Sequence, residues 1–177
     1  NMPTWSASYA FGLADYVRHS GDADFAAAVW PGVRRLTEWF ERQRRLDDLL
    51  VVVPTKRTDN GPGRYGYVLA DWAPTRLDGA VSVMNMFYLR YLEECAWLAG
   101  LLGRPSETED LSRLADRTRT AIRDRLYDDA RGIFANCRDE TGLSRQAGYQ
   151  ENLLALLWNI ASPDQERRIV QALLPDD

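Results

Sequence analysis

The stretch DGAVSVMNMFYLRYLEECAWLAGLL, residues 78 to 102, predicts the central element of the fold, because apolar side chains occur on every side of it. Its apolar residues spread around the whole helical turn and include Val81, Met84, Phe87, Tyr88, Leu92, Cys95 and Leu98. A helix with one face in water carries a single apolar stripe, whereas one that is apolar all round is buried by its neighbours. We therefore predict a buried helix over residues 78–102.

The segments around this helix carry the patterns of further helices. Apolar residues between Phe25 and Phe40 recur every three or four positions, which indicates an amphipathic helix. Apolar-rich and amphipathic segments alternate along the chain. The predicted helices are residues 5–20, 24–46, 78–102, 107–126, 149–161 and 163–174.

Several helix ends have recognisable chemistry. Gly21 favours the left-handed conformation that ends a helix, and Asp22 can accept hydrogen bonds from the free amides of the next one. A serine followed three residues later by Glu or Gln predicts a capping box, and this pattern starts at Ser106 and at Ser162. Asp78 is predicted to cap the buried helix rather than to bind a ligand.

The alternation of apolar and amphipathic helices predicts an all-α fold of helical hairpins. Apolar helices suit the inner layer of an α/α toroid, and amphipathic helices suit its outer layer. We predict a single partial barrel domain over residues 1–177, with about three hairpins, half of an (α/α)6 barrel. Its hairpins span about 5–46, 78–126 and 149–174, and short extended segments are expected at 49–54 and 132–136.

Composition excludes several classes of protein. The 177 residues are 45% hydrophobic and 27% charged, which is typical of a globular domain. The net charge of −4 argues against nucleic-acid binding. No apolar run approaches the roughly 20 residues that cross a bilayer, so no membrane partner is expected and the cytoplasm is the default location. The chain opens in mid-pattern at Asn1, which suggests a fragment.

Metal and cofactor chemistry is not expected. His19 is the only histidine and stands at a predicted helix end, where a cation favours the helix dipole. Of the two cysteines, Cys95 is predicted to be a core residue, whereas a disulfide with Cys137 stays open. Too few cysteines and histidines are present for zinc, and no acidic segment has the spacing of a calcium loop.

Ordered motifs resemble the catalytic barrel of bacterial α-L-rhamnosidases. The most specific pieces are GDADF and VWPGVRR in the first predicted hairpin, the pair Asp71-Trp72, LYDDARGIF, and Gln150-x-Asn152-x-Leu-Ala-Leu. The resemblance covers most of the chain in order. The similar runs are residues 8–40, 68–74, 79–104, 114–136 and 150–174.

This resemblance implies a six-hairpin glycosidase that hydrolyses terminal L-rhamnosyl linkages with inversion. Inversion uses two carboxyl groups about 6.5–9.5 Å apart, one as acid and one as base. In the family, the acid lies upstream of the region that NMPTWSAS resembles, and the base lies in a later hairpin. Neither is therefore assigned in this chain, which is predicted to be inactive alone. The helical glutamates are predicted to lie on the surface: Glu38, Glu41, Glu93, Glu94 and Glu109.

Substrate binding is what the resemblance can carry over to this chain. In such barrels the inner helices begin at the mouth, and the residues at this level are Trp5, Asp71, Trp72, Gln150 and Asn152. An aromatic face stacks on a sugar ring, and carboxylate or amide groups bond its hydroxyls. The alternative roles are a turn for the aspartate, a rim plug for Trp72 and a cap for one of the two amides. The remaining tryptophans considered, Trp30, Trp39, Trp97 and Trp158, are predicted to lie in the core.

Two other function classes stay open. A half-barrel could bind a carbohydrate without catalysis, or it could act as a helical scaffold for protein partners. A half-barrel also exposes apolar flanks, which predicts self-association.

Overall fold

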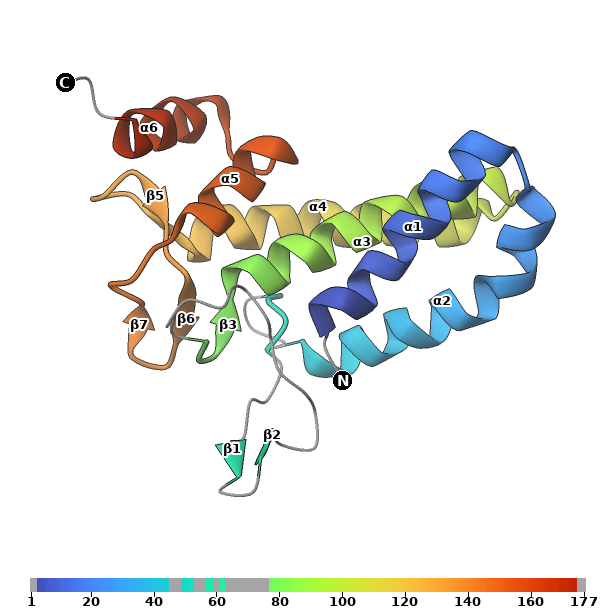
Figure 1. Cartoon of the computed structure of the whole chain (residues 1–177), viewed down its shortest axis with the longest axis horizontal. Helices are drawn as coiled ribbons and strands as arrows, with labels where there is room; N and C mark the ends of the chain where they lie inside the picture. The colour runs from blue at the N-terminus through green and yellow to red at the C-terminus, as the bar shows by residue number, and fades with distance from the viewer. Residues whose placement is uncertain (1–2, 45–48, 53–56, 59–60, 63–76, 175–177) are drawn as a thin grey trace.

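The computed structural model describes residues 3–44, 49–52, 57–58, 61–62 and 77–174. The helices form three successive pairs (Figure 1). They are α1 (Pro3–Ser20) with α2 (Ala23–Gln43), α3 (Ser82–Leu101) with α4 (Pro105–Arg125), and α5 (Tyr149–Leu157) with α6 (Pro163–Leu173). Seven short strands join them: β1 (Arg57–Thr58), β2 (Gly61–Pro62), β3 (Ala80–Val81), β4 (Tyr127–Asp128), β5 (Ile133–Phe134), β6 (Cys137–Asp139) and β7 (Gly142–Leu143).

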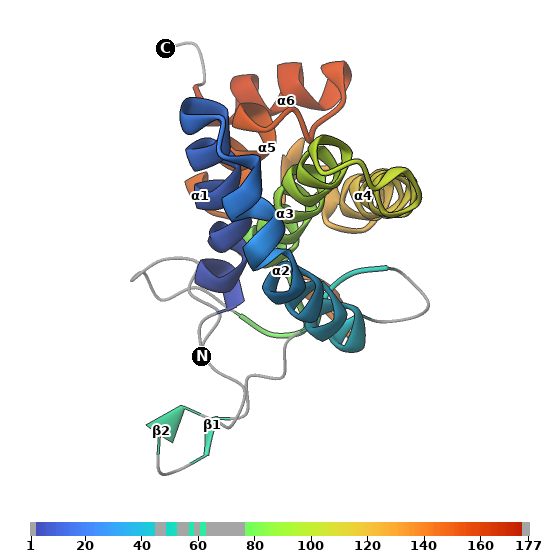
Figure 2. The same ribbon diagram turned by 90° about the vertical axis from the view of Figure 1, so that its right-hand side faces the viewer.

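The helix α3 lies at the centre of the molecule, as the sequence predicts. Figure 2 looks along it and shows α1 and α4 on opposite sides, with α2 below and α5 and α6 above. Most of its side chains are buried, among them Tyr88, Tyr91 and Leu92 at 0% exposure. The inner helices α1, α3 and α5 and the outer helices α2, α4 and α6 make a partial helical toroid, which confirms the predicted fold class.

Aromatic rings join the three inner helices. Phe11 of α1 and Phe87 of α3 have ring centroids 5.8 Å apart, and Trp158 at the end of α5 lies 5.8 Å from the first and 5.1 Å from the second. Such edge and tilted contacts add to the free energy gained by burying the rings. Trp30 is also buried, but the prediction of a core position is wrong for Trp97, which is 37% exposed.

Two of the predicted helix ends are confirmed in atomic detail. Gly21 has φ +72°, and Asp22 accepts a hydrogen bond from the Phe25 amide at 2.9 Å. At α6 the Ser162 hydroxyl accepts from the Gln165 amide, and the Gln165 side chain accepts from the Ser162 amide. These caps satisfy amides that no helical carbonyl can reach.

Three other ends differ from the prediction, each for a local reason. The helix α4 starts at Pro105 after Arg104, so Ser106 lies inside the helix and does not cap it; proline favours the first helical position. Asp78 does not cap α3, because the N-cap is Val81. At α5 the helix stops at Leu157, since Asn159 adopts φ +52°, a left-handed conformation that asparagine tolerates.

The end of α5 is held by arginines of α4. Arg119 donates from its guanidinium to the Asn159 carbonyl at 2.6 Å. Arg123 donates to the Ile160 carbonyl at 2.5 Å and to the Ala161 carbonyl at 3.2 Å. Cationic donors at a helix C-terminus satisfy free carbonyls and favour the helix dipole. The third hairpin is therefore tied to the second at this end.

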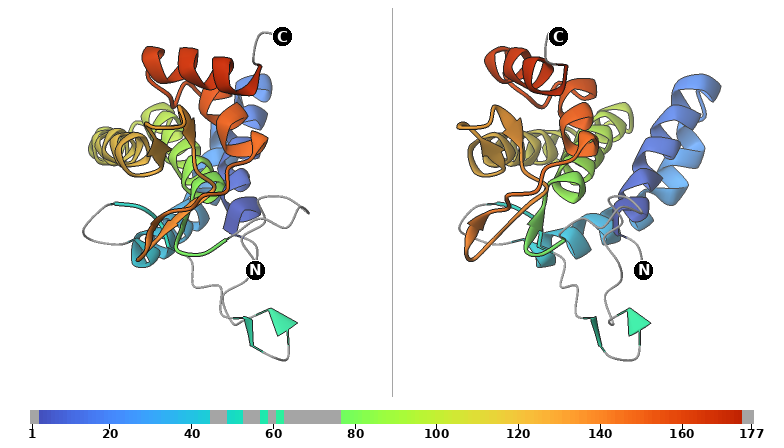
Figure 3. Two further views of the ribbon diagram at one scale, coloured as in Figure 1. Left: turned by 90° about the vertical axis from the view of Figure 1, so that its left-hand side faces the viewer. Right: turned by 60° about the vertical axis from the view of Figure 1, so that its left-hand side comes forward.

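A three-stranded antiparallel sheet stands where α3 and α5 begin (Figure 3). Its order is β3-β6-β7, with Val81 opposite Cys137 and Arg138 opposite Leu143. Gly79 enters this sheet at φ +68°, and a Cβ there would lie 2.3 Å from the Arg138 carbonyl oxygen. The predicted helix start near residue 78 is wrong, because pairing with a strand almost 60 residues later draws the segment into the sheet.

The two cysteines are both buried and free, so no disulfide links them. Within the described part of the chain, no helix is long and apolar enough to cross a membrane.

Candidate functional site

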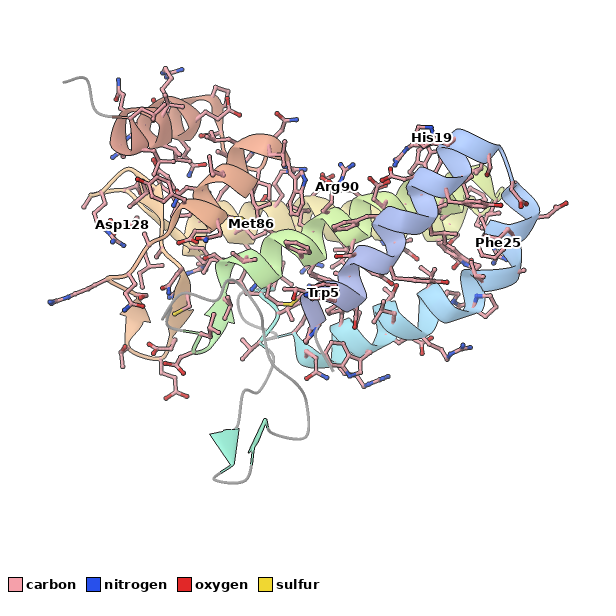
Figure 4. All side chains as sticks on the ribbon, viewed as in Figure 1. Trp5, His19, Phe25, Met86, Arg90 and Asp128 are labelled. Atoms are coloured by element: carbon pink, nitrogen blue, oxygen red, sulfur yellow. The ribbon has the colours of Figure 1, made fainter. Side chains whose placement is uncertain are left out.

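The three inner helices begin at one end of the molecule. In Figure 1, α1, α3 and α5 all run from the left towards the right, so their N-termini gather on the side of the three-stranded sheet. We call this end the mouth. Figure 4 shows Trp5 in the first turn of α1, and its side chain is 66% exposed. At the first position of α5, Tyr149 is 64% exposed.

The predicted sugar-contact residues Asp71 and Trp72 lie outside the described residues. Two described residues, one before and one after the stretch that contains them, are positioned by α3. Upstream is Val51, and downstream is Val81 at the N-cap of the helix. Both are bonded to one side chain, that of Asn85.

Asn85 is fully buried at the fourth position of α3. Its carbonyl oxygen accepts from the Val51 amide at 2.7 Å, and its amide nitrogen donates to the Val51 carbonyl at 3.1 Å. The same nitrogen donates to the Val81 carbonyl at 2.9 Å. A buried amide with every polar atom bonded is a stabilising bridge, because the backbone groups it serves have no access to water. Asn85 therefore closes the base of the segment between residues 51 and 81.

Asn152 repeats this arrangement at the fourth position of α5. Its oxygen accepts from the Phe134 amide at 2.8 Å, and its nitrogen donates to the Phe134 carbonyl at 3.1 Å and to the Gly148 carbonyl at 2.9 Å. The side chain is 0% exposed. The prediction that Asn152 contacts a sugar is thus corrected: its amide is taken up by the backbone and closes the base of the segment between residues 134 and 148.

Gln150 and Glu151 lie beside this anchor. Gln150 is half-buried in the first turn of α5 and stays a predicted sugar contact. Glu151 is 3% exposed, and its carboxylate accepts a hydrogen bond from the Gly148 amide. Burial raises the pKa of Glu151 above its ordinary value, although the Gly148 amide works in the opposite direction. Its carboxylate is used as a cap for α5.

Sequence reasoning missed Asn85 and Glu151 as residues that shape the mouth. A signal was present, because an asparagine stands at the fourth position of both α3 and α5. The signal is weak by itself, since asparagine is an ordinary residue on helix surfaces. Only the contacts 34 and 18 residues away show that both asparagines serve the same purpose.

The helical glutamates do not form a catalytic pair in the described structure. Glu94 is 3% exposed, so its predicted surface position is wrong; it pairs with Arg18 at 2.5 Å and with Arg90. Glu93 pairs with Arg119 and with Arg90, and burial raises its pKa. These carboxylates neutralise arginines of their own helix and of its neighbours α1 and α4, which is a structural role.

Metal binding finds no support in the part of the chain that the structure describes. No group of three or more His, Cys, Asp or Glu side chains gathers there to hold an ion. His19 is exposed in the last turn of α1, near the helix C-terminus.

Two solved structures are similar to this chain. A GH78 family rhamnosidase of Bacillus sp. GL1 matches with TM-score 0.84 and 24% identity, over 99% of this chain and 18% of that one. A rhamnosidase from Klebsiella oxytoca with rhamnose bound matches with TM-score 0.78 and 19% identity, over 97% of this chain and 30% of that one. At these identities the likeness shows the fold alone, and the chain spans less than a third of either neighbour.

A comparison with curated proteins gives no match. A family model does match, and it covers residues 3–177, nearly the whole chain. Its description is the mannosylglycerate hydrolase MGH1-like glycoside hydrolase domain. The chain belongs to this MGH1-like glycoside hydrolase family and has the fold of a rhamnosidase-like six-hairpin glycosidase in part.

Proposed function

We propose that this chain is one part of a glycoside hydrolase barrel that cleaves terminal L-rhamnosyl linkages with inversion. Residues 1–177 form a single partial barrel domain in this proposal, with the cytoplasm as its location. The family match over residues 3–177 carries the hydrolase assignment. The rhamnosyl preference rests on the fold shared with two rhamnosidases and on the motifs quoted above.

The sugar lies at the mouth in this proposal. Trp5 offers an exposed indole at the start of α1, and Gln150 stands in the first turn of α5. Asp71 and Trp72 belong to the segment whose base Asn85 closes. An indole face and polar oxygens suit a sugar, since the ring has apolar C–H faces and a rim of hydroxyls.

The two catalytic carboxyl groups lie outside this chain in our proposal. Glu151 is the buried carboxylate nearest the candidate residues of α5, and it is committed to the Gly148 amide. A carboxylate that is already committed to a backbone amide is not free to act as the acid or the base that inversion needs.

An assay of the 177-residue chain and of a longer relative on an aryl α-L-rhamnoside tests the proposal. We expect turnover by the longer protein and none by the chain alone. In the longer protein, Asp71→Asn and Trp72→Ala should raise KM by at least about tenfold, which is the effect of losing a charged hydrogen bond or a stacking contact. Turnover by the chain alone would refute the absence of the carboxyl pair.

Mannosylglycerate is the second candidate substrate, favoured by the description of the matching family. The two candidates differ in sugar and in leaving group, so one experiment separates them. The longer protein is assayed on both compounds, and the ratio of kcat/KM identifies the substrate. A ratio that favours mannosylglycerate would replace the rhamnosyl assignment and keep the hydrolase assignment.

A binding module without catalysis, or a scaffold for protein partners, would use the same fold. Calorimetry of the chain with L-rhamnose separates the first from the second, because only the binding module gives a saturable heat. If the chain gives no heat of binding with either L-rhamnose or mannosylglycerate, the scaffold for protein partners is the function that remains.

The inner helices on either side of α3, which are α1 and α5, also expose apolar side chains. On α1 the exposed side chains are Trp5, Tyr9 and Tyr16, and on α5 they are Tyr149, Leu153 and Leu157. Successive spacings of four and seven residues on α1, and of four and four on α5, place each set on one face of its helix. We propose that these apolar faces pack against further helices or against a second copy of the chain. The exposure of Trp5 then has two explanations: its indole binds a sugar, or it packs in such an interface. Sedimentation should show self-association, and a monomer at all concentrations would contradict it.

A further inference from the structure

A groove lies between α3 and α4, apart from the mouth. Its volume is about 350 Å³, and the side chains that form it include Glu93, Trp97, Thr108, Ser112 and Asp116. We call it the Trp97 groove. In Figure 1, α5 lies beside the N-terminal half of α3, and the C-terminal half of α3 extends past it. Trp97 stands in that C-terminal half and is 37% exposed.

The indole of Trp97 is held in place from the side of α1. The Arg18 guanidinium carbon lies 4.2 Å from its ring centroid, within cation–π range. Arg18 is fixed in turn by Glu94 at 2.5 Å and by Asp15 at 3.2 Å. Arg18 does not line the groove, so it supports the ring from outside. A ring fixed before binding loses little side-chain entropy when a ligand stacks on it.

The other groove residues offer hydrogen-bonding groups. Glu93 is oriented by Arg119 of α4 and by Arg90, whereas Asp116 is exposed. Thr108 and Ser112 add two hydroxyl groups on α4, and the Thr108 hydroxyl donates to the Arg104 carbonyl at 3.0 Å, which leaves its oxygen to accept. Oriented acceptors beside an aromatic wall match the hydroxyl rim and C–H face of a sugar ring.

We propose that the Trp97 groove is a second carbohydrate-binding site, which holds one sugar unit of a glycan away from the mouth. The volume falls in the range of small-molecule sites. The indole stacks on the ring, and the Asp116 carboxylate with the Ser112 hydroxyl bonds its hydroxyls. The support by Arg18 also explains the buried Glu94, since an ion pair of this kind adds little stability of its own. None of the groove residues belongs to the mouth, so the two sites are independent.

Nuclear magnetic resonance of the whole chain with ¹⁵N-labelled tryptophan tests this proposal. The indole signals are followed while L-rhamnose, D-mannose, D-glucose or D-galactose is added, and Trp97→Phe identifies the signal of Trp97. We expect a saturable shift of that signal with at least one sugar, in the millimolar range. In Asp116→Asn the sugar concentration at half of the shift of the Trp97 signal should rise about tenfold, or the shift should vanish, through the loss of a charged contact. Trp97→Ala lacks that signal, so its binding is measured by calorimetry, which should show a similar weakening through the loss of the stacking contact.

Two control variants separate this site from the alternatives. Trp5→Ala, at the mouth, and Leu101→Ala, exposed on the same helix as Trp97, should leave the shift of the Trp97 signal unchanged. The proposal is overturned if no sugar shifts that signal, or if Trp5→Ala removes the shift. It is also overturned if Trp97→Ala lowers stability while Asp116→Asn leaves the sugar-dependent shift intact, because Trp97 then only covers the ion pair of Arg18 and Glu94. Failure at the mouth would leave these results unaffected.

Discussion

In two regions of the molecule an asparagine near the start of an inner helix holds a distant backbone segment, with nearly the same geometry. Asn85 binds both backbone groups of Val51, at 2.7 and 3.1 Å, and Asn152 binds both backbone groups of Phe134, at 2.8 and 3.1 Å. Each asparagine also bonds the N-cap carbonyl of its own helix at 2.9 Å. The hairpins therefore share an anchor that overall sequence patterns do not reveal.

The regions differ in what the anchor holds. Asn85 lies 34 residues after its partner, and Asn152 lies 18 after its partner. Closing a loop of nearly twice the length costs only about 0.6 kcal/mol more. One anchor therefore serves loops of different length on a constant helical frame. Residues on such loops can vary without disturbing the helices.

The helices behind the two anchors also differ. The first anchor belongs to α3, which packs against α1, α2, α4 and α5. The second belongs to α5, nine residues long, with Tyr149, Leu153 and Leu157 exposed. A helix this short depends on tertiary contacts for its stability. We expect the loss of the first anchor to destabilise the whole chain and the loss of the second to act mainly on α5.

The largest effect is expected for Asn85→Ala. The buried amide and carbonyl of Val51 would lose their side-chain partner, and each unpaired group costs about 1–3 kcal/mol. The free energy of unfolding, measured by urea denaturation, should fall by about 3 kcal/mol in one cooperative transition. Ser112→Ala, an exposed change on α4, serves as the control. A loss below about 0.5 kcal/mol, the usual range of surface changes, would show that Val51 is not held by this bond.

A smaller and more local effect is expected for Asn152→Ala. The free energy of unfolding should fall by about 2 kcal/mol, since similar groups lose their partner but fewer elements pack on α5. Hydrogen exchange should quicken at the Phe134 amide and in α5 and stay slow in α3. Equal acceleration in both helices would mean that the two regions unfold as one unit and that their difference is only apparent.

The sequence predicts the helices and the caps because these depend on neighbours in the chain. Asp22 and Ser162 cap amides three residues away, and a stretch of 25 residues suffices to identify α3 as buried. Such local rules explain why the fold class, the three hairpins and the helix caps at Asp22 and Ser162 were predictable. The same rules misplace the start of α3, because residues 80 and 81 pair with the distant strand β6 instead of joining the helix.

The candidate site is less predictable because its geometry depends on distant partners. Glu94 looks like a surface residue until Arg18, 76 residues earlier, is placed beside it. Asn152 looks like a sugar ligand until Phe134 is placed against it. Asp71 and Trp72 lie outside the described residues, so their sugar contact stays a prediction. Burial and pairing are tertiary properties, and periodicity alone does not identify them.

The smallest effect concerns pH and separates the two regions by chemistry. The third residue of α5 is Glu151, whereas the third residue of α3 is Met84. Burial raises the pKa of Glu151 above 4.5, its ordinary value. Between that value and the folded pKa, the folded chain holds a proton that the unfolded chain has released. The contribution of Glu151 to the free energy of unfolding is therefore fully present below pH 4.5 and is lost as the pH rises through the folded pKa.

Replacement of this carboxyl group should flatten that dependence. In Glu151→Gln the side-chain oxygen still accepts from the Gly148 amide, but no charge is buried. Urea denaturation across this pH range should give a smaller decline for the variant than for the unchanged chain. Glu109→Gln is the matched control, because that side chain is 80% exposed and should leave the decline as it was. If both variants decline as the unchanged chain does, the pH dependence does not arise at the second anchor, and the two asparagine regions differ only in packing.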